Sequence, residues 1–463
     1  MRLNPAGWLD IRMAHNCFQT EYTELFAPKA YFNGNRTMHH ADAGGRHSKN
    51  QLHSSQVDIV LNAEFGGAKW LWLIGGEHIR DYYQNRPWTY DYTVLEPVLD
   101  RDGNTLVGSR VYQFWDPFIH EPIRLSKVAV GPDPFTIYEE DPNRREGLYT
   151  SVRASFLNER LHAMAGIRSE TFTQKIYSSG NLVDSLSVSA KTPMGGLLYE
   201  VTESLAFFAS FSENYQPNRG VNVRGRGARD DEIEGLPPEY GRGYDVGLKL
   251  NFRDSSLSGS LTYFQLEREN IARPDRLRNL TDPRNLDDSF TNNVTWTSVS
   301  GRERTAGIEL DLLWQPSTQY QVLAAASWMW EARRVTDPAL DPEGVEFERT
   351  IDNKLRLPNA PEYLLSIWNK YTFTEGRFVG LSAGIGFRYT SNVNPRGDEP
   401  LVSDLVLGGF VVWDAMVEYP FVWAGIDSRV QLTVRNLFDK KYSEGSEAYA
   451  DPVRVYLSLR LGF

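Results

Sequence analysis

The chain has 463 residues, a formal charge of -11 at pH 7 and a pI of about 5.4, an acidity that speaks against a nucleic-acid-binding protein. Only 41% of the residues are hydrophobic, and no apolar run approaches the roughly 18 residues that a spanning helix needs. A helical membrane protein is therefore excluded. The single cysteine, Cys17, excludes a disulfide framework.

Segments that alternate apolar and polar residues recur along the whole chain. An alternation with period two predicts a strand that has one apolar face and one polar face. Charged residues such as Asp245, Lys249 and Glu309 fall on the second face, which indicates a wet lumen. The predicted strands include residues 8–14, 152–156, 244–252, 306–314, 381–389, 413–419 and 430–434.

The last eleven residues, 453–463, alternate without a break and end on Phe463. Leu459, Leu461 and Phe463 lie on the apolar face of this segment. An outer-membrane barrel closes its wall with such a strand and carries an aromatic residue at the lipid boundary. Aromatic residues near other predicted strand ends suggest interface girdles, although aromatics are also ordinary strand formers; they are Trp8, Trp70, Trp314, Trp413, Tyr419 and Trp423.

The connections between these strands alternate between short and long. Short turns fall near residues 66–67, 158–160, 200–203, 253–256, 315–317, 375–376 and 420–425. Long polar loops cover residues 21–50, 84–145, 175–187, 216–239, 271–295, 335–358, 392–405 and 442–452. Bacterial outer-membrane barrels have short periplasmic turns and long external loops. The pattern predicts an all-β transmembrane antiparallel barrel with about sixteen strands in this chain.

Four segments in the same order resemble the TonB-dependent outer-membrane receptors. Residues 436–442 (NLFDKKY), followed by the closing strand, resemble the C-terminal signature of that family. Residues 205–217 (LAFFASFSENYQP) look like its mid-barrel strand, and residues 192–197 and 244–249 are similar to the strands on either side. The resemblance covers nearly the whole chain. It implies that the protein is located in the bacterial outer membrane. The partners that it implies are TonB, outer-membrane lipid and the barrel-assembly machinery. In the family, residues like Leu459, Leu461 and Phe463 resemble the signal that this machinery recognises.

The family also implies a signal peptide, a TonB box, a plug domain and 22 strands. Strand-like sequence begins here almost at Met1, with no charged-then-apolar leader. We therefore expect residues 1–463 to be an N-terminally incomplete receptor barrel domain, non-functional alone, with TonB acting through the missing part. Unpaired backbone groups at an open sheet edge are costly in lipid. The other possibility is therefore that this chain closes on itself with about sixteen strands as a passive porin-like channel.

The resemblance implies uptake of a scarce ligand, for which we expect a ferric siderophore, with a carbohydrate or cobalamin as alternatives. Arginine forks pair well with anionic oxygens, and aromatic rings stack on sugars or catechols. The candidate ligand residues are Arg219, Arg224, Arg226 and Arg229 in one loop, and Trp88, Tyr90 and Trp115 in another. The acids after the arginines could instead neutralise them, and the rings could pack within their own loop.

No enzymatic activity, cofactor or metal site is expected. We find no nucleophile with a base at a recognisable spacing, and His39, His40 and His47 lack the surrounding residues that a metal site needs. A soluble β-propeller should show a blade repeat every 40 to 50 residues, and the sequence has none.

Overall fold

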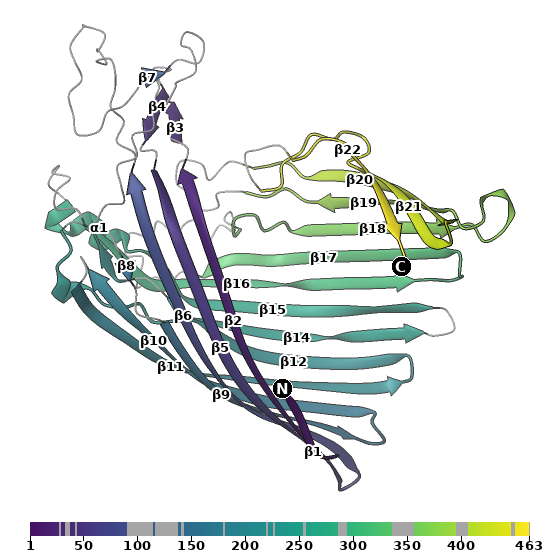
Figure 1. The fold of residues 1–463 in the computed structure, drawn as a ribbon, viewed down its shortest axis with the longest axis horizontal. Coiled ribbons are helices and arrows are strands. Elements are labelled where there is room, and N and C mark those ends of the chain that lie inside the picture. Colours follow the sequence, from purple (N-terminus) through teal and green to yellow (C-terminus); the bar gives the residue numbers. More distant parts are fainter. Residues whose placement is uncertain are drawn as a thin grey trace.

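The computed structural model describes residues 1–26, 29–32, 38–41, 44–89, 114–115, 138–139, 143–178, 181–218, 221–225, 227–252, 256–285, 294–335, 356–394, 406–445 and 450–462. One antiparallel sheet of nineteen strands dominates this part of the chain. It curves into a trough, with the first strands in front and the fainter middle strands behind (Figure 1).

Sixteen of these strands form an up-and-down meander in which each strand pairs with the next. They are β2 (Leu9–Phe26), β5 (Gly44–Phe65), β6 (Ala68–Thr89), β9 (Asn143–Phe156), β10 (Leu161–Ser178), β11 (Asn181–Thr202), β12 (Leu205–Gln216), β14 (Glu239–Phe252), β15 (Leu257–Pro274), β16 (Thr295–Trp314), β17 (Tyr320–Val335), β18 (Tyr363–Thr372), β19 (Ser382–Thr390), β20 (Phe410–Trp423), β21 (Ile426–Arg435) and β22 (Arg454–Leu461). The predicted strand number and antiparallel order are confirmed.

Short elements complete the sheet and occupy the loops. β1 (Arg2–Ala6) pairs with the start of β2, a strand that the sequence interpretation missed, while β8 (Tyr138–Glu139) and β13 (Val223–Arg224) join β6 and β16. A separate small sheet contains β3 (Lys29–Phe32), β4 (Met38–Ala41) and β7 (Phe114–Trp115). The helical turns are η1 (Asp230–Glu232), α1 (Arg276–Thr281), η2 (Pro283–Asn285) and η4 (Gly376–Phe378). Among the described residues, no helix is long and apolar enough to cross a bilayer.

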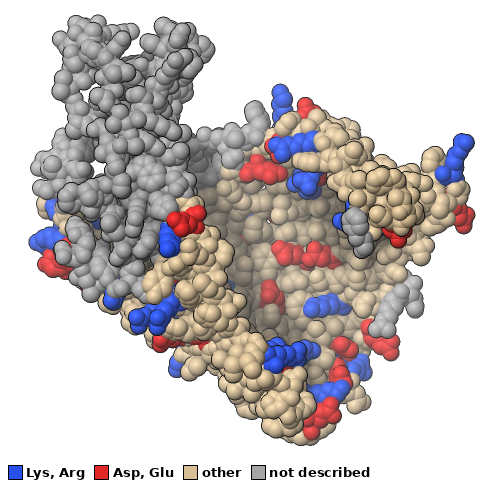
Figure 2. Space-filling view, viewed as in Figure 1, with Lys and Arg blue, Asp and Glu red and all other residues tan. Residues whose placement is uncertain are grey.

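The register places apolar residues on one face and charged residues on the other. Val246, Tyr263, Ile308 and Trp328 are consecutive partners across four strands, and all four are exposed on the convex, lipid-facing side. Residues of the opposite parity face the hollow of the trough, where acidic and basic side chains are visible (Figure 2). The two-faced wall predicted from the alternation is therefore present.

Several rings on the hollow side lie flat across a glycine of the neighbouring strand. Tyr149 of β9 covers Gly75 of β6, its direct partner, where a Cβ atom would overlap the ring. The phenol bonds to Asp58, and Gln56 Nε2 donates to the phenol oxygen at 2.9 Å. Glycine at such a position lets the ring lie against the wall instead of projecting into the lumen.

Several of the predicted long loops are partly strand. In the predicted loop 175–187, β10 and β11 remain paired up to Ser178 and Asn181, and β15 continues to Pro274 within the predicted loop 271–295. β2 and β5 pair through Phe26 and Gly44, within the predicted loop 21–50, and β6 continues to Thr89. Apolar residues occur in these strand ends without a regular alternation, for example Leu25 and Phe26 in β2 and Leu182 and Val183 in β11, so no period of two identifies them as strands.

The described part of the sheet is open. β22 pairs only with β21, and no pairing joins it to β1 or β2. The two outermost strands are therefore separate edges of the trough, and closure at about sixteen strands is not what the described residues form (Figure 1).

Candidate functional site

A polar recess lies on the hollow side near the end of the wall that carries the long loops. Its volume is about 490 Å³. Two cross-strand rows build it. One row runs from Asn214 through Gly241 and Arg268 to Glu303, and the next runs from Ser212 through Gly243 and Leu266 to Thr305. Leu357, which precedes β18, contributes to its lining.

The two glycines explain why the wall recedes here. Gly241 and Gly243 alternate on β14, so both lack a side chain on the same face. A Cβ atom on Gly241 would overlap Asn214, whereas one on Gly243 would lie 3.2 Å from Leu266 Cδ2. The amide of Asn214 and the hydroxyls of Ser212 and Thr305 thus border a hollow that larger residues on β14 would fill.

The charge of Arg268 in this recess is already compensated. Its Nη2 lies 2.7 Å from Glu239 Oε2 and its Nη1 lies 3.2 Å from Glu303 Oε2. Arg273 Nη2 reaches the same Glu303 at 3.4 Å. The recess therefore offers hydrogen-bonding groups on an ion-paired wall. Such a surface suits a polar ligand held by several directional contacts.

The arginine loop lies beside this recess, but the structure describes only part of it. Arg224 is exposed on β13, opposite Thr295. Arg229 is also exposed, and its Nη2 lies 2.7 Å from Glu232 Oε1. One of the four predicted arginines is thus paired with an acid that follows it in the loop. This agrees with the alternative that these acids neutralise the arginines. Arg219 and Arg226 lie outside the described residues.

The predicted aromatic ligand residues are not gathered at the recess by the described chain. Trp88 belongs to β6, opposite Gly45, and Trp115 belongs to β7, opposite Met38. Their side chains and the whole of Tyr90 lie outside the described part. A ligand role for these three residues stays a prediction.

The closing strand has the expected form. In β22, Leu459 is opposite Val430 and Leu461 is opposite Ser428, and Leu459 is 59% exposed. Phe463 lies outside the described residues. Among the predicted girdle residues, Trp314 and Trp423 are the last residues of their strands, and Trp70 packs between Phe65 and Phe156 beside a short turn.

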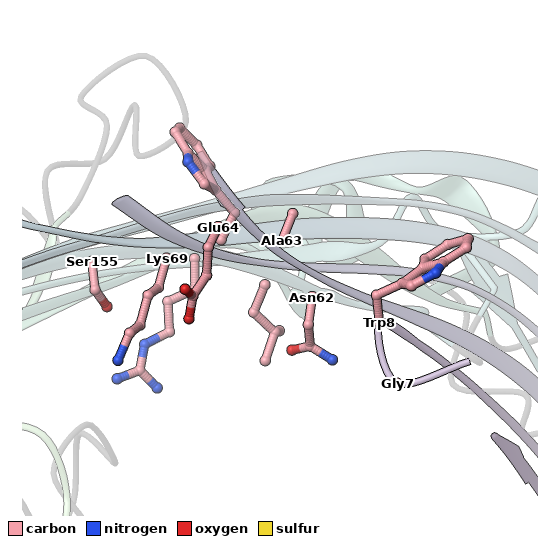
Figure 3. Close-up of a pocket in the computed structure, with 10 residues that line it drawn as sticks. Gly7, Trp8, Asn62, Ala63, Glu64, Lys69 and Ser155 are labelled. Carbon is pink, nitrogen blue, oxygen red and sulfur yellow. The ribbon is translucent and has the colours of Figure 1, made fainter. Parts of the chain in front are cut away.

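A second hollow, of about 370 Å³, lies at the short-turn end of the wall. Four of the lining side chains project from the same side of the strands, namely those of Asn62, Glu64, Lys69 and Ser155 (Figure 3). Lys69 is ion-paired with Glu159 across the turn between β9 and β10. This hollow is separate from the polar recess. Lys69 is at the start of β6, and the whole length of that strand separates it from the outer loops.

Within the described residues, no group of three histidine, cysteine, aspartate or glutamate side chains is placed to hold a metal ion. Sequence reasoning missed the recess residues, above all Asn214, Gly241, Arg268 and Glu303. The one available signal was the pair of glycines two residues apart, directly before the predicted strand 244–252.

A curved wall with a lipid face, a charged hollow face and long loops at one end is the architecture of an outer-membrane β-barrel wall. The chain belongs to the family described as TonB dependent receptor-like, beta-barrel, whose model matches residues 15–437. It is accordingly a protein of the bacterial outer membrane.

Known proteins similar to this chain are receptors. The metal-pseudopaline receptor CntO of Pseudomonas aeruginosa is 26% identical over 318 residues, covering 66% of this chain and 39% of the relative. The chain thus spans about two fifths of the length of that curated relative. The ferric preacinetobactin receptor BauA of Acinetobacter baumannii has a similar fold, with a TM-score of 0.71 at 14% identity, covering 99% of this chain and 61% of the other. FpvA of P. aeruginosa, solved with bound pyoverdine, also has a similar fold. The TM-score is 0.69 at 18% identity, and the match covers 99% of this chain and 55% of FpvA.

Proposed function

We propose that this chain is the main part of the wall of a receptor that takes up a ferric siderophore or a similar metal chelate, with energy supplied through TonB. The names of its relatives support this ligand class, since they include receptors for metal-pseudopaline, ferric preacinetobactin and pyoverdine. The polar recess at the outer end of the wall carries the proposal. Of the two hollows in the described part of the wall, it is the one nearer the outer loops.

The recess and the arginine loop would contribute differently to binding. Ser212, Asn214 and Thr305 would bond to amide, hydroxyl or carbonyl groups at the periphery of the chelate. Arg224 is exposed and carries no ion pair within the described chain, so it is the better of the two described arginines for an anionic group. A chelate with both features would use both surfaces.

We also propose that further strands complete this wall, and that the plug and the TonB box lie outside residues 1–463. The edge of β2 supports this. β1 follows β2 only as far as the pair Met1 and Met13, whose backbone hydrogen bonds measure 2.8 and 2.9 Å. From Ala14 to Phe26, β2 has no described partner on that side. Each unpaired backbone group costs several kcal/mol in hydrocarbon, so this edge needs a neighbouring strand.

An uptake assay tests both proposals. The chain is expressed with an export signal, alone or joined to the plug, TonB box and remaining strands of the metal-pseudopaline receptor, in cells that lack their own siderophore receptors. Radioactive iron complexes of pyoverdine, preacinetobactin and ferrichrome serve as probes. We expect TonB-dependent uptake only with the joined chain. Uptake by the chain alone that needs TonB would refute the incomplete wall, and TonB-independent leakage of all three complexes would favour a passive pore.

A substitution in the recess tests the site. Gly243→Leu would fill the hollow, because its side chain points between Ser212 and Leu266. We expect binding of the preferred complex to weaken at least about tenfold. Gly195→Leu is the matched control, since a Cβ atom there meets only Met164 O at 3.5 Å and lies on the lipid-facing side. Equal affinity in the two variants would remove the recess from the site.

A further inference from the structure

Two neighbouring outer loops are joined by a short strand pair. β13, in the connection between β12 and β14, pairs with the first residues of β16 through Val223 opposite Trp296. The backbone N–H of Thr297 donates to Asn222 O at 2.7 Å and extends this pairing. Loops that share backbone hydrogen bonds cannot move apart without breaking them.

A small apolar core lies beneath this strand pair. Val223 is fully buried, Val294 and Trp296 are nearly so, and Ala228 and Ile233 pack against them. The three buried residues come from both loops. Separating the loops would expose all of them to water, which opposes the separation.

Arg284, in the loop between β15 and β16, connects the two loops by its side chain. Its Nη1 donates to Glu232 Oε2 at 2.7 Å and to Gly227 O at 2.9 Å, both in the other loop. Its remaining nitrogens bond to both carboxylate oxygens of Asp282 at 3.0 and 2.8 Å. A planar fork with fixed donors can hold this arrangement, which a lysine ammonium cannot.

The groups around Arg284 are themselves held. Asp282 accepts a hydrogen bond from Trp296 Nε1 at 2.8 Å, so the guanidinium is tied to the apolar core. Asn279 bonds to both the backbone N–H and the carbonyl of Trp296, at 2.6 and 3.1 Å. A polar network satisfied in this way gives one defined arrangement of the loops.

Arg284 also changes what Arg229 can do. Glu232 is shared, because Arg229 binds its Oε1 and Arg284 binds its Oε2. If an anion took Arg229, Glu232 would keep Arg284 as a partner. The release of Arg229 would therefore not leave Glu232 unpaired, and the other partner of Arg229, Asp231 at 3.7 Å, is exposed and can be solvated by water.

We propose that Arg284 is a positioning residue that makes the described residues of two outer loops (221–225 and 227–235 in one, 275–285 and 294–296 in the other) one rigid unit, here called the rim module, and so presents Arg224 and Arg229 in a fixed place at the outer mouth. The unit follows from the contacts within the chain alone. Only its use in holding a ligand rests on the proposed receptor function.

Hydrogen–deuterium exchange on the full chain in detergent tests the unit without any ligand. In Arg284→Gln we expect amides in 221–235 and in 275–285 to exchange at least about tenfold faster, together, while β14 and β15 keep their protection. Arg302→Gln is the matched control, because it breaks an ion pair of 2.8 Å with Glu269 outside the module. Faster exchange confined to 275–285 would refute the proposal, and so would the same change in the control.

A removable cross-link adds a second measurement. Arg224 and Thr295 are a direct antiparallel pair, for which Cα atoms lie about 5.5 Å apart, within the range of a disulfide. In a Cys17→Ser background, R224C and T295C are combined with Arg284→Gln. Oxidation should return protection to 221–235, and reduction should remove it again. In Arg284→Lys, the amides of 221–235 should be less protected from exchange than in the native chain. Native protection in this variant would show that the guanidinium fork is not needed.

Discussion

Phe264 on β15 lies across Gly307, its direct partner on β16. A Cβ atom on Gly307 would be 2.9 Å from two ring carbons of Phe264 and 2.6 Å from Trp328 O. Both distances are far inside normal contact, and the backbone oxygen cannot move away without disturbing β17. The ring and the backbone together require glycine at this position.

We therefore expect Gly307→Val to destabilise the wall by about 1–3 kcal/mol, the usual cost of forcing extra atoms into a packed site. Urea unfolding of the chain in detergent measures it. Gly195→Val is the control, because the wall leaves room there. A Gly307 variant as stable as this control would show that the ring simply moves aside.

The closing strand offers a test of the lipid face. Leu459→Asp places a charge on that face of β22, at a cost that depends on depth in the bilayer. Ser458→Asp places the same charge on the other face. With an export signal supplied, the Leu459 variant should accumulate unfolded in the periplasm. The Ser458 variant should assemble, as followed by heat-modifiable migration on gels; equal assembly of both would contradict the assigned faces.

Acid should open the rim module. The Arg284 guanidinium, helped by Trp296 Nε1, holds the pKa of Asp282 well below its usual range, and Arg284 followed by Arg229 lowers the pKa of Glu232. A carboxyl whose pKa is lower in the folded state contributes stability above its ordinary pKa and loses it as pH falls through the lowered value. The module should thus stay closed at pH 5 and open progressively below about pH 4.

Limited proteolysis with an acid-active protease, scored at residues 221–235, follows this opening. Asp282→Asn should flatten the pH dependence, since the amide cannot titrate, and should leave the module partly open at pH 5. A native chain that is cut equally at pH 5 and pH 3 would contradict the assignment.

The arginine loop makes a prediction about ligand charge. Replacing Arg219, Arg224, Arg226 and Arg229 together by Ala in the completed receptor should weaken an anionic complex more than a neutral one. Exposed pairs contribute about 0.2–1 kcal/mol each, so a difference of roughly tenfold is expected. Binding of ferric pyoverdine and of ferrichrome to isolated outer membranes measures it. Unchanged affinity for the anionic complex would remove this loop from the site.

The sequence was sufficient for the wall but not for the recess. Alternation along residues 244–252 and 306–314 predicts strands and their faces because each side chain meets either lipid or water. The recess needs a different kind of information. Asn214, Arg268 and Glu303 are far apart in sequence and meet only through the register of four strands. Likewise, no local pattern indicates that Arg284 reaches Glu232 across 52 residues.

The same limit explains the wrong loop boundaries. Above the lipid, no face of a strand needs to be apolar, so Ile176, Leu182 and Val183 follow no regular period although residues 175–178 and 181–187 are paired at every position except Val183. Turn chemistry near Ser178 gives the only local signal. A reading that relies on hydrophobic alternation will therefore end such strands too early.

The hairpin of β10 and β11 has a consequence for how the cell surface is built. β11 has 22 residues, or roughly 70 Å of strand at about 3.3 Å per residue, whereas the apolar band of such a wall is only about 25 Å tall. Even when tilted, a large part of this ribbon stands outside the bilayer, where β11 remains paired with β10 on one side. A flexible loop of that length would present an antibody with many shapes. A paired ribbon restricts the backbone to fewer shapes than such a loop would have, so the strand ends at Ser178 and Asn181 would present a more defined surface to an antibody.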